Sequence, residues 1–441
     1  MDSPRSEMIP NNSLRHHLGQ KRSIKIIEVD KGGSKRAIRL LQAFFSAISG
    51  MLADRALLEG LGVGDANSSA TYAVLLNVIK DVASRFCTIG FAQRFGLRIE
   101  SECKKYRFMA DFFNDTAFFL VLASPRVSGV GKAFLLASAE GLRAMCGVAG
   151  SASKAALSSH FALQNNMAEL NAKEASQETA VGLIGLLAGT IVVKLVEDRT
   201  AVFCLMVALV LGHLYVNCLG VRCVSLRVLN RQRASLVFAH WLRRGEALTP
   251  AQVSAQESIL SWSPYVSNSR GQWKGIVHFA KDYSDFMESG HDFFIYEEEY
   301  CKISTRRLPH QDTLHAKILI NVGAQPVEVI RAWFMAMEII WGDKGEDGKE
   351  AWESQTRANQ LFLYKDGALI THLQDAGWDL DTSAMEPGNA LRVQICYPVE
   401  EDGKKKSNFQ SFWEGVGEQG GRCPSFWEES FSALYYDSRC M

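Results

Sequence analysis

Residues Thr200–Val221 read TAVFCLMVALVLGHLYVNCLGV and carry no formal charge between Arg199 and Arg222. A membrane-spanning helix needs roughly 20 mostly apolar residues, and this run reaches that length. The alternative interpretation is a buried helix inside a soluble protein. The sequence favours a membrane span here.

The apolar run before it, Ala180–Val193, is short for a span on its own. Together the two runs predict a helical hairpin that turns at Glu197–Arg199. Gly185 and Gly189 are four residues apart in the first helix. Small residues at this spacing would let another helix approach closely.

The polar stretch Asn165–Gln177 enters this hairpin. Asn171 and Glu174 have the spacing of a capping box, and Ser176 is expected to restart the helix. Capping does not explain Lys173 and Glu178. One interpretation is that these two line a ligand or partner pocket at the mouth of the bundle, and the other is a solvated loop.

Further helices carry internal charges, among them Lys80, Asp81, Asp111 and Asp115. Asp111 and Asp115 are four residues apart and share a helix face. In a membrane bundle such groups are expected to face a shared interior, where they could contact a ligand or partner. The expected helices are Ile38–Leu58, Thr71–Phe95, Tyr106–Ala123, Lys132–Leu163, Gln177–Val196 and Thr200–Leu229.

Six arginines follow the most apolar run, and no acidic residue occurs among them before Glu246. An excess of Arg and Lys marks the cytoplasmic side of a span. The protein is therefore expected in a membrane, with its C-terminal domain on the cytoplasmic-type side. The arginines are Arg222, Arg227, Arg231, Arg233, Arg243 and Arg244.

The fold class expected is mainly α, with a helical membrane-associated bundle followed by a smaller soluble α+β domain. The domains are a basic, poorly ordered N-terminus at 1–37, the bundle at 38–245 and the α+β domain at 250–441. In the last domain, strands are expected at Asp292–Ser304 and Leu391–Tyr397. Helices are expected there at Val327–Ile340 and Lys349–Leu373.

Composition and motifs narrow the function. Basic and acidic residues number 48 each, so no charge excess indicates nucleic acid binding. The ten cysteines are dispersed without a C-x-x-C pair, so neither a disulfide framework nor a metal site is predicted. The glycine-rich Gly60–Asp65 follows a helix rather than a strand, which excludes a dinucleotide loop. No catalytic residue or cofactor is indicated, and five histidines stand alone in the sequence: His160, His213, His278, His291 and His315.

Several runs follow one another at characteristic spacings. They are Gly62–Ala66, Lys80–Asp81, KYRFMADFFND at Lys105–Asp115, CGVAGSASKAALSSHFALQNNMAELNAKEASQET at Cys146–Thr179, HLYVNCLGVRCVSLRVLNRQR at His213–Arg233 and, more loosely, AGWDLD at Ala376–Asp381. In this order the runs resemble the root UVB sensitive family, whose domain is tied to vitamin B6 homeostasis. The resemblance implies a membrane-associated protein that acts with other family members, and it implies no reaction. The family's usual Gly after Lys-Asp is Val82 here, and its usual Trp before Arg is Tyr106.

Two functions remain open. The first is a transporter-like membrane factor for a small polar solute linked to vitamin B6 homeostasis, supported by polar groups inside several helices. The second is a membrane-anchored scaffold without catalysis, whose C-terminal domain binds protein partners. The partners expected are membrane lipid, other family members and a small polar solute, and no nucleic acid.

Overall fold

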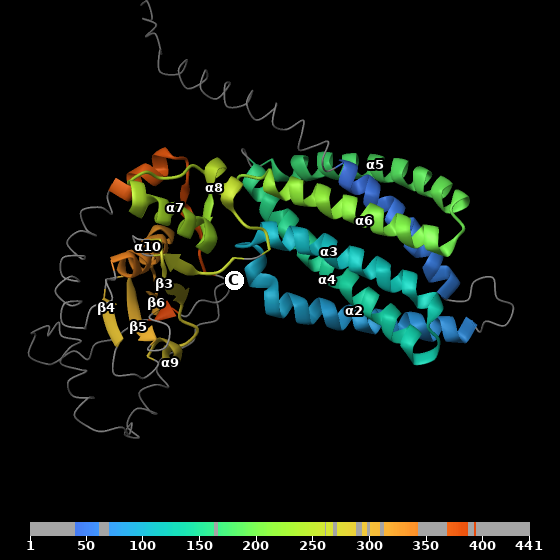
Figure 1. Cartoon of the computed structure of the whole chain (residues 1–441), viewed down its shortest axis with the longest axis horizontal. Coiled ribbons are helices and arrows are strands. Elements are labelled where there is room, and N and C mark those ends of the chain that lie inside the picture. The colour runs from blue at the N-terminus through green and yellow to red at the C-terminus, as the bar shows by residue number, and fades with distance from the viewer. Residues whose placement is uncertain are drawn as a thin grey trace, which may run out of the picture.

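The structure is a computed structural model that describes residues 40–60, 70–162, 166–260, 262–267, 271–287, 293–297, 300–308, 313–342, 368–386 and 392–393. It consists of a helical bundle beside a smaller part in which helices pack on a sheet (Figure 1). This confirms the expected fold class. The N-terminus at 1–37, Leu61–Asp65 and most of Lys349–Leu373 lie outside the described residues.

The bundle contains the six helices expected from the sequence. They are the helix at 40–60, α2 (Ala70–Ile99), α3 (Cys103–Ala123), α4 (Gly129–Phe161), α5 (Met167–Leu195) and α6 (Arg199–Arg222), with a short helix η1 (Ser124–Arg126) between α3 and α4. The bundle core includes Leu52, Leu76, Phe118, Leu136 and Met206.

The largest departures from the predicted helix boundaries are at the start of α5 and the end of α6, and the other boundaries differ by a few residues. α5 begins at Met167, after Asn166, and continues unbroken to Leu195, so the expected cap at Asn171 and restart at Ser176 are wrong. The Asn171 side chain instead accepts a hydrogen bond from Ser158 of α4 at 2.7 Å. α6 ends at Arg222 rather than Leu229.

The chain after α6 forms a strand because a distant segment pairs with it. Strand β1 (Val228–Asn230) pairs in parallel with β7 (Asp379–Ala384). Asn230 then caps helix α7 (Arg231–Arg244), its side chain accepting a hydrogen bond from the backbone N–H of Arg233 at 2.9 Å. Tertiary pairing therefore overrides the helical pattern of the apolar residues before Asn230.

The sheet in the second part mixes parallel and antiparallel pairs. Its strands lie in the order β2-β3-β6-β5-β4, and β8 also pairs with β6. The bounds are β2 Tyr265–Ser267, β3 Trp273–Phe279, β4 Phe293–Glu297, β5 Cys301–Leu308, β6 Thr313–Asn321 and β8 Arg392–Val393. The single strand expected at Asp292–Ser304 is wrong, because β4 and β5 form an antiparallel pair there.

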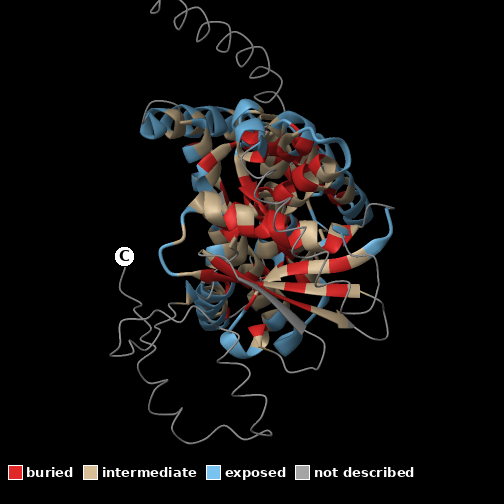
Figure 2. Ribbon diagram, turned by 90° about the vertical axis from the view of Figure 1, so that its left-hand side faces the viewer, coloured by how far each residue is buried: buried red, intermediate tan, exposed pale blue. Residues whose placement is uncertain are grey.

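Helix α10 lies in the core of this part and contributes several of its buried residues. It spans Pro326–Gly342, as expected for Val327–Ile340, and it buries Trp333 and Phe334. Phe334 packs edge-on against Phe238 of α7, with ring centroids 5.1 Å apart. Buried residues accordingly concentrate where the sheet and these helices meet (Figure 2). The remaining helices are α8 (Pro250–Gln256), α9 (Tyr283–Phe286) and a helix at 368–375.

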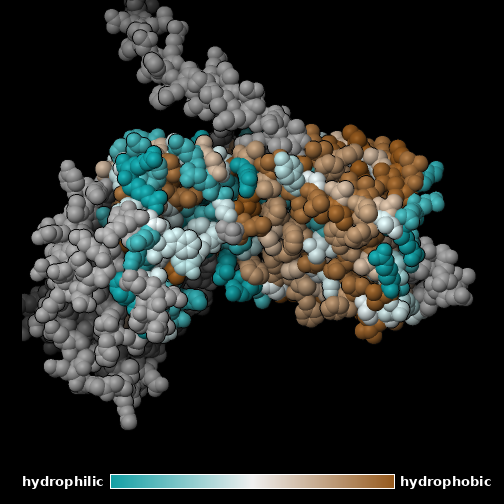
Figure 3. Space-filling view, in the orientation of Figure 1, coloured by the Kyte–Doolittle hydropathy of each residue, from teal (hydrophilic) through white to brown (hydrophobic). Residues whose placement is uncertain are grey.

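The outer surface of the bundle is apolar. Figure 3 shows hydrophobic residues over most of the bundle, with hydrophilic residues at its far end and over α7 and α8. Three helices among the described residues are long and apolar enough to cross a membrane, namely α4, α5 and α6. The sequence had singled out the last two of these.

Candidate functional site

A pair made of one buried carboxylate and one buried histidine lies inside the bundle between α3 and α6. Asp115 Oδ2 and His213 Nδ1 are 2.8 Å apart, and both residues are 2% exposed. Phe118, Met206 and Val210, on the same two helices, belong to the apolar core of the bundle. The sequence predicted Asp115 inside the bundle. It indicated no partner for His213, because Asp115 is 98 positions away.

Other polar atoms near this pair lack partners. Asp115 Oδ1 and Asn217 Nδ2 have no hydrogen-bond partner among the described residues. Asn217 lies one turn after His213 on α6 and is also buried. A buried polar atom without a partner is costly, and a functional role or a bound water or ion is among the explanations for it.

A second polar group lies one helical turn before Asp115. Asp111 accepts a hydrogen bond from Arg107 at 3.1 Å on the same helix, and another from Gln42 of the helix at 40–60. Asp111 and Asp115 therefore share the inner side of α3, as their spacing predicted. The interior polar groups come from three helices, and ionisable groups at such positions are functional candidates in membrane proteins.

Lys80 and Asp81 lie elsewhere. Lys80 Nζ is 3.4 Å from Asn77 Oδ1 on its own helix α2, and Asp81 is exposed. The expectation that these two face a shared interior with Asp111 and Asp115 is therefore wrong, because α2 turns their face outward. Whether they contact a ligand or partner stays a prediction.

Lys173 and Glu178 lie on the exposed surface of α5. Lys173 pairs with Glu169 on the same helix, and Glu178 pairs with Lys154 of α4 at 3.0 Å. Neither residue lines a described cavity. Their proposed contact with a ligand or partner stays a prediction.

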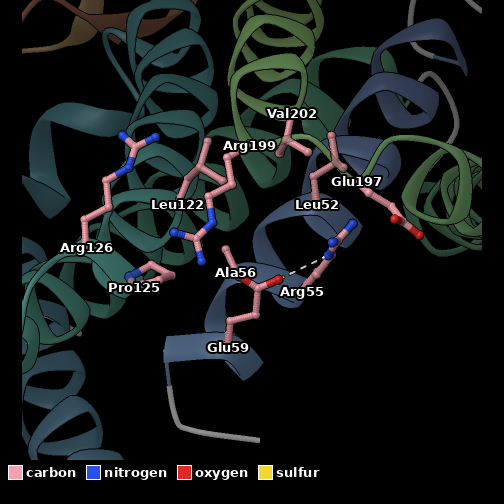
Figure 4. Close-up of a pocket in the computed structure, with 10 residues that line it drawn as sticks. All are labelled: Leu52, Arg55, Ala56, Glu59, Leu122, Pro125, Arg126, Glu197, Arg199 and Val202. Carbon is pink, nitrogen blue, oxygen red and sulfur yellow. Dashed lines mark hydrogen bonds and ion pairs between the residues drawn. The ribbon is translucent and has the colours of Figure 1, made fainter. Parts of the chain in front are cut away.

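A small cavity lies at the end of the bundle remote from the sheet. Arg55, Arg126 and Arg199 gather around it (Figure 4). Its volume is about 50 Å³, and since one water occupies roughly 10–15 Å³ by this measure, it holds a few waters rather than a metabolite. Arg55 donates hydrogen bonds to the carbonyl oxygens of Val193 and Val196, which stabilises the end of α5.

No group of three or more His, Cys, Asp or Glu side chains suited to a metal ion occurs within the described part of the chain. The cysteines described there are all free thiols.

Comparison with known proteins places this bundle in a family. Residues 36–245 match a family model described as the vitamin B6 photo-protection and homoeostasis domain. "RUS family member 1" of Dictyostelium discoideum is 37% identical over 229 residues, which cover 50% of this chain and 42% of that protein. "Protein root UVB sensitive 3" of Arabidopsis thaliana is 33% identical over 223 residues, which cover 50% of each chain.

A more distant relative, "Protein root UVB sensitive 2, chloroplastic" of Arabidopsis thaliana, is 27% identical over 235 residues, 50% of this chain and 51% of that protein. The chain spans about half the length of the first of these curated relatives. No solved structure matches the chain. Through its residues 36–245, the chain belongs to the root UVB sensitive family, which is linked to vitamin B6 homeostasis and the UV-B response.

Proposed function

We propose that the chain is embedded in a membrane through α4, α5 and α6, and that its bundle acts as a transporter-like factor for a small polar solute linked to vitamin B6. The observation that carries this proposal is the buried Asp115–His213 pair. An ionisable pair inside an apolar bundle is expensive to maintain and is a functional-site hypothesis by default.

The packing of α5 supports a membrane location. Its only fully buried residues are Gly185 and Gly189, whereas its large apolar residues, such as Leu187 and Leu195, are exposed. A helix in a soluble protein does the reverse, because it buries its large apolar face. Membrane helices pack through small residues and turn Leu and Ile toward lipid.

The outer face of α2 supports a protein partner in the membrane. Exposed Val78, Val82 and Phe86 lie beside Lys80 and Asp81 on this helix. A charged side chain that faces lipid at the centre of the bilayer costs roughly 2.5–3.5 kcal/mol on insertion scales. Contact with another family member is the proposed role of this face, and lipid covers the remaining apolar surface.

We place the part containing the sheet on the cytoplasmic-type side, because basic residues follow α6. Two of the six arginines have other uses: Arg231 pairs with Glu102 and Arg233 with Glu257. The sidedness therefore depends on the other four. A protease added to sealed vesicles should cleave a tag at Met441 only from that side, and cleavage from the opposite face alone would refute this orientation.

Transport is tested with the full chain in proteoliposomes. Uptake of radiolabelled pyridoxine is measured with and without an imposed pH gradient. Asp115→Asn and His213→Gln should each lower initial uptake about tenfold or more, since each removes one ionisable group of the buried pair. Glu140→Gln is the matched control, because Glu140 pairs with Arg143 at 3.7 Å on a half-exposed part of α4.

The exchange variant Asp115→His with His213→Asp restores the pair in reverse and should recover part of the uptake. Equal uptake by the wild type and both single variants, at equal protein amounts in the membrane, would refute the transport proposal.

The scaffold remains the second candidate, and one observation favours it. Strand β4 lies at the end of the sheet and pairs only with β5 among the described strands. An open sheet edge can accept a strand from another protein. Complementation of a deletion strain by the Asp115→Asn variant, despite lost uptake, would favour this role.

A further inference from the structure

A larger cavity lies where the bundle meets the part containing the sheet. Its volume is about 300 Å³, and it is lined by the end of α2, the start of α3, the start of α7 and the segment after α8. These elements adjoin one another in the middle of the molecule (Figure 1). The volume is at the lower end of the range for small-molecule sites.

Each of the two carboxylates in this cavity is shared by two cations. Glu257 contacts Lys104 of α3 at 2.5 Å and Arg233 of α7 at 3.0 Å, and all three side chains are almost completely buried. Glu102 contacts Arg231 at 2.9 Å and Lys105 at 3.2 Å. The arrangement therefore leaves positive charge uncompensated around each carboxylate.

A fifth cation adds to this excess. Arg98 lines the same cavity, and its guanidinium forms no ion pair with the residues that the structure describes. Five cationic side chains thus face two carboxylates, a surplus of three positive charges. Burial lowers the pKa of Arg231, Glu102 raises it, and the nearby positive charge of Arg98 lowers it further. An anion in the cavity would relieve this repulsion.

The wall beside these cations is aromatic. The guanidinium of Arg231 lies 5.4 Å from the ring centroid of Trp262. Tyr106 and Phe95 also line the cavity, with their rings 6.4 Å apart. Flat apolar surface beside a cluster of cations suits a ligand with an anionic group at one end and a flat body at the other.

We propose that this cavity binds a phosphate group, held chiefly by Arg98, Arg231 and Lys105. Arginine and lysine are the usual partners of phosphate in proteins. The phosphate belongs to a small aromatic phosphomonoester or to the headgroup of a lipid. The inference does not rest on transport by the bundle, because it uses none of the residues of the Asp115–His213 pair.

The test uses the full chain in nanodiscs of neutral phosphatidylcholine, with phenyl phosphate as the probe in calorimetric titrations. Phenyl phosphate should bind, inorganic phosphate more weakly, and phenol not measurably. Arg98→Gln should weaken binding of phenyl phosphate about tenfold or more, because a charge-assisted hydrogen bond is lost.

Arg94→Gln is the matched control. Arg94 lies one turn earlier on α2, is exposed, stacks over Phe95 at 5.6 Å and does not line the cavity. Its removal should change the affinity by less than about twofold. Equal weakening by both variants would mean that the probe responds to general surface charge, and this would overturn the proposal.

A second arm distinguishes the sources of the phosphate. If a lipid headgroup fills the cavity, nanodiscs containing phosphatidic acid should lower the affinity of the wild type for phenyl phosphate about tenfold. If the ligand is a free phosphomonoester, phosphatidic acid should change little. Absence of phenyl phosphate binding in neutral nanodiscs, together with no effect of Arg98→Gln on retention of phosphatidic acid, would refute the site.

Discussion

The contact between α5 and the helix at 40–60 allows a graded mutational test. A Cβ atom at Gly185 would lie 2.6 Å from Ala47 Cβ and 3.3 Å from the carbonyl oxygen of Phe44. At Gly189 it would meet the Met51 side chain at 3.2 Å. At Gly182, on the same helix, it would meet nothing within 4 Å.

These distances set the order of the expected effects. Carbon atoms prefer separations of about 3.5–4.0 Å, so Gly185→Ala must push the two helices apart by roughly 1 Å. Overpacking of this kind costs about 1–3 kcal/mol. Gly189→Ala should cost less than about 1 kcal/mol, because Met51 is flexible and can move aside. Gly182→Ala should be neutral or stabilising by up to about 1 kcal/mol, since Ala favours helix more than Gly.

The assay is the thermal midpoint of each purified variant in one detergent, followed by fluorescence-detected size exclusion. The expected order of stability is Gly182→Ala, then Gly189→Ala, then Gly185→Ala. A Gly185→Ala variant as stable as Gly182→Ala would show that the helices do not pack as described. Gly185→Ser, which is only slightly larger than Ala, should repeat the loss.

Three further predictions concern groups outside this contact. Glu257→Gln should lower the unfolding free energy by about 3–5 kcal/mol, because Lys104 and Arg233 then stay buried without a carboxylate; Glu102→Gln, at a more exposed pair, should cost less in the same thermal melts. Arg55→Ala removes two hydrogen bonds from a charged donor, at 3.1 and 3.0 Å, and should speed amide hydrogen exchange at the end of α5. Burial lowers the pKa of His278, helped by Lys317, His315 and Lys281 and opposed by Asp285. As the pH falls, His278 therefore takes up a proton near pH 6.5 in the unfolded chain, before it does so in the folded chain. The contribution of His278 to stability is thus complete above pH 6.5. Below that pH the free energy of unfolding falls by up to about 1.4 kcal/mol per pH unit. The thermal midpoint of His278→Gln should fall less steeply than that of the wild type between about pH 7 and pH 5.5.

Local patterns predicted the long elements well. The apolar runs located α5 and α6, and the spacing of Gly185 and Gly189 predicted the close helix approach that the structure confirms. The break between β4 and β5 was missed because the sequence between these strands contains consecutive glutamates and no Gly or Pro, so no turn signal interrupts the strand pattern.

Partners across the chain could not be predicted in this way. Asp115 and His213 are 98 residues apart, and Lys104 and Glu257 are 153 residues apart. No local period connects residues at such distances, since only the packing of helices brings them together. The larger cavity, where the bundle meets the part containing the sheet, could not be predicted for the same reason, because its carboxylates and cations come from four separate elements.

The two polar sites share one rigid element. α3 carries Lys104 at its first turn and Asp115 further along, at a rise of about 1.5 Å per residue and hence a separation of about 16 Å. α6, which carries His213, leads directly into β1 and α7, and α7 supplies Arg231 and Arg233 to the cavity. If an anion draws the starts of α3 and α7 together, it acts on α3 directly and on α6 through its connection to α7 by way of β1. Such coupling must be reciprocal, so a change in the protonation of the pair that depends on the anion implies an equal effect of that protonation on anion affinity.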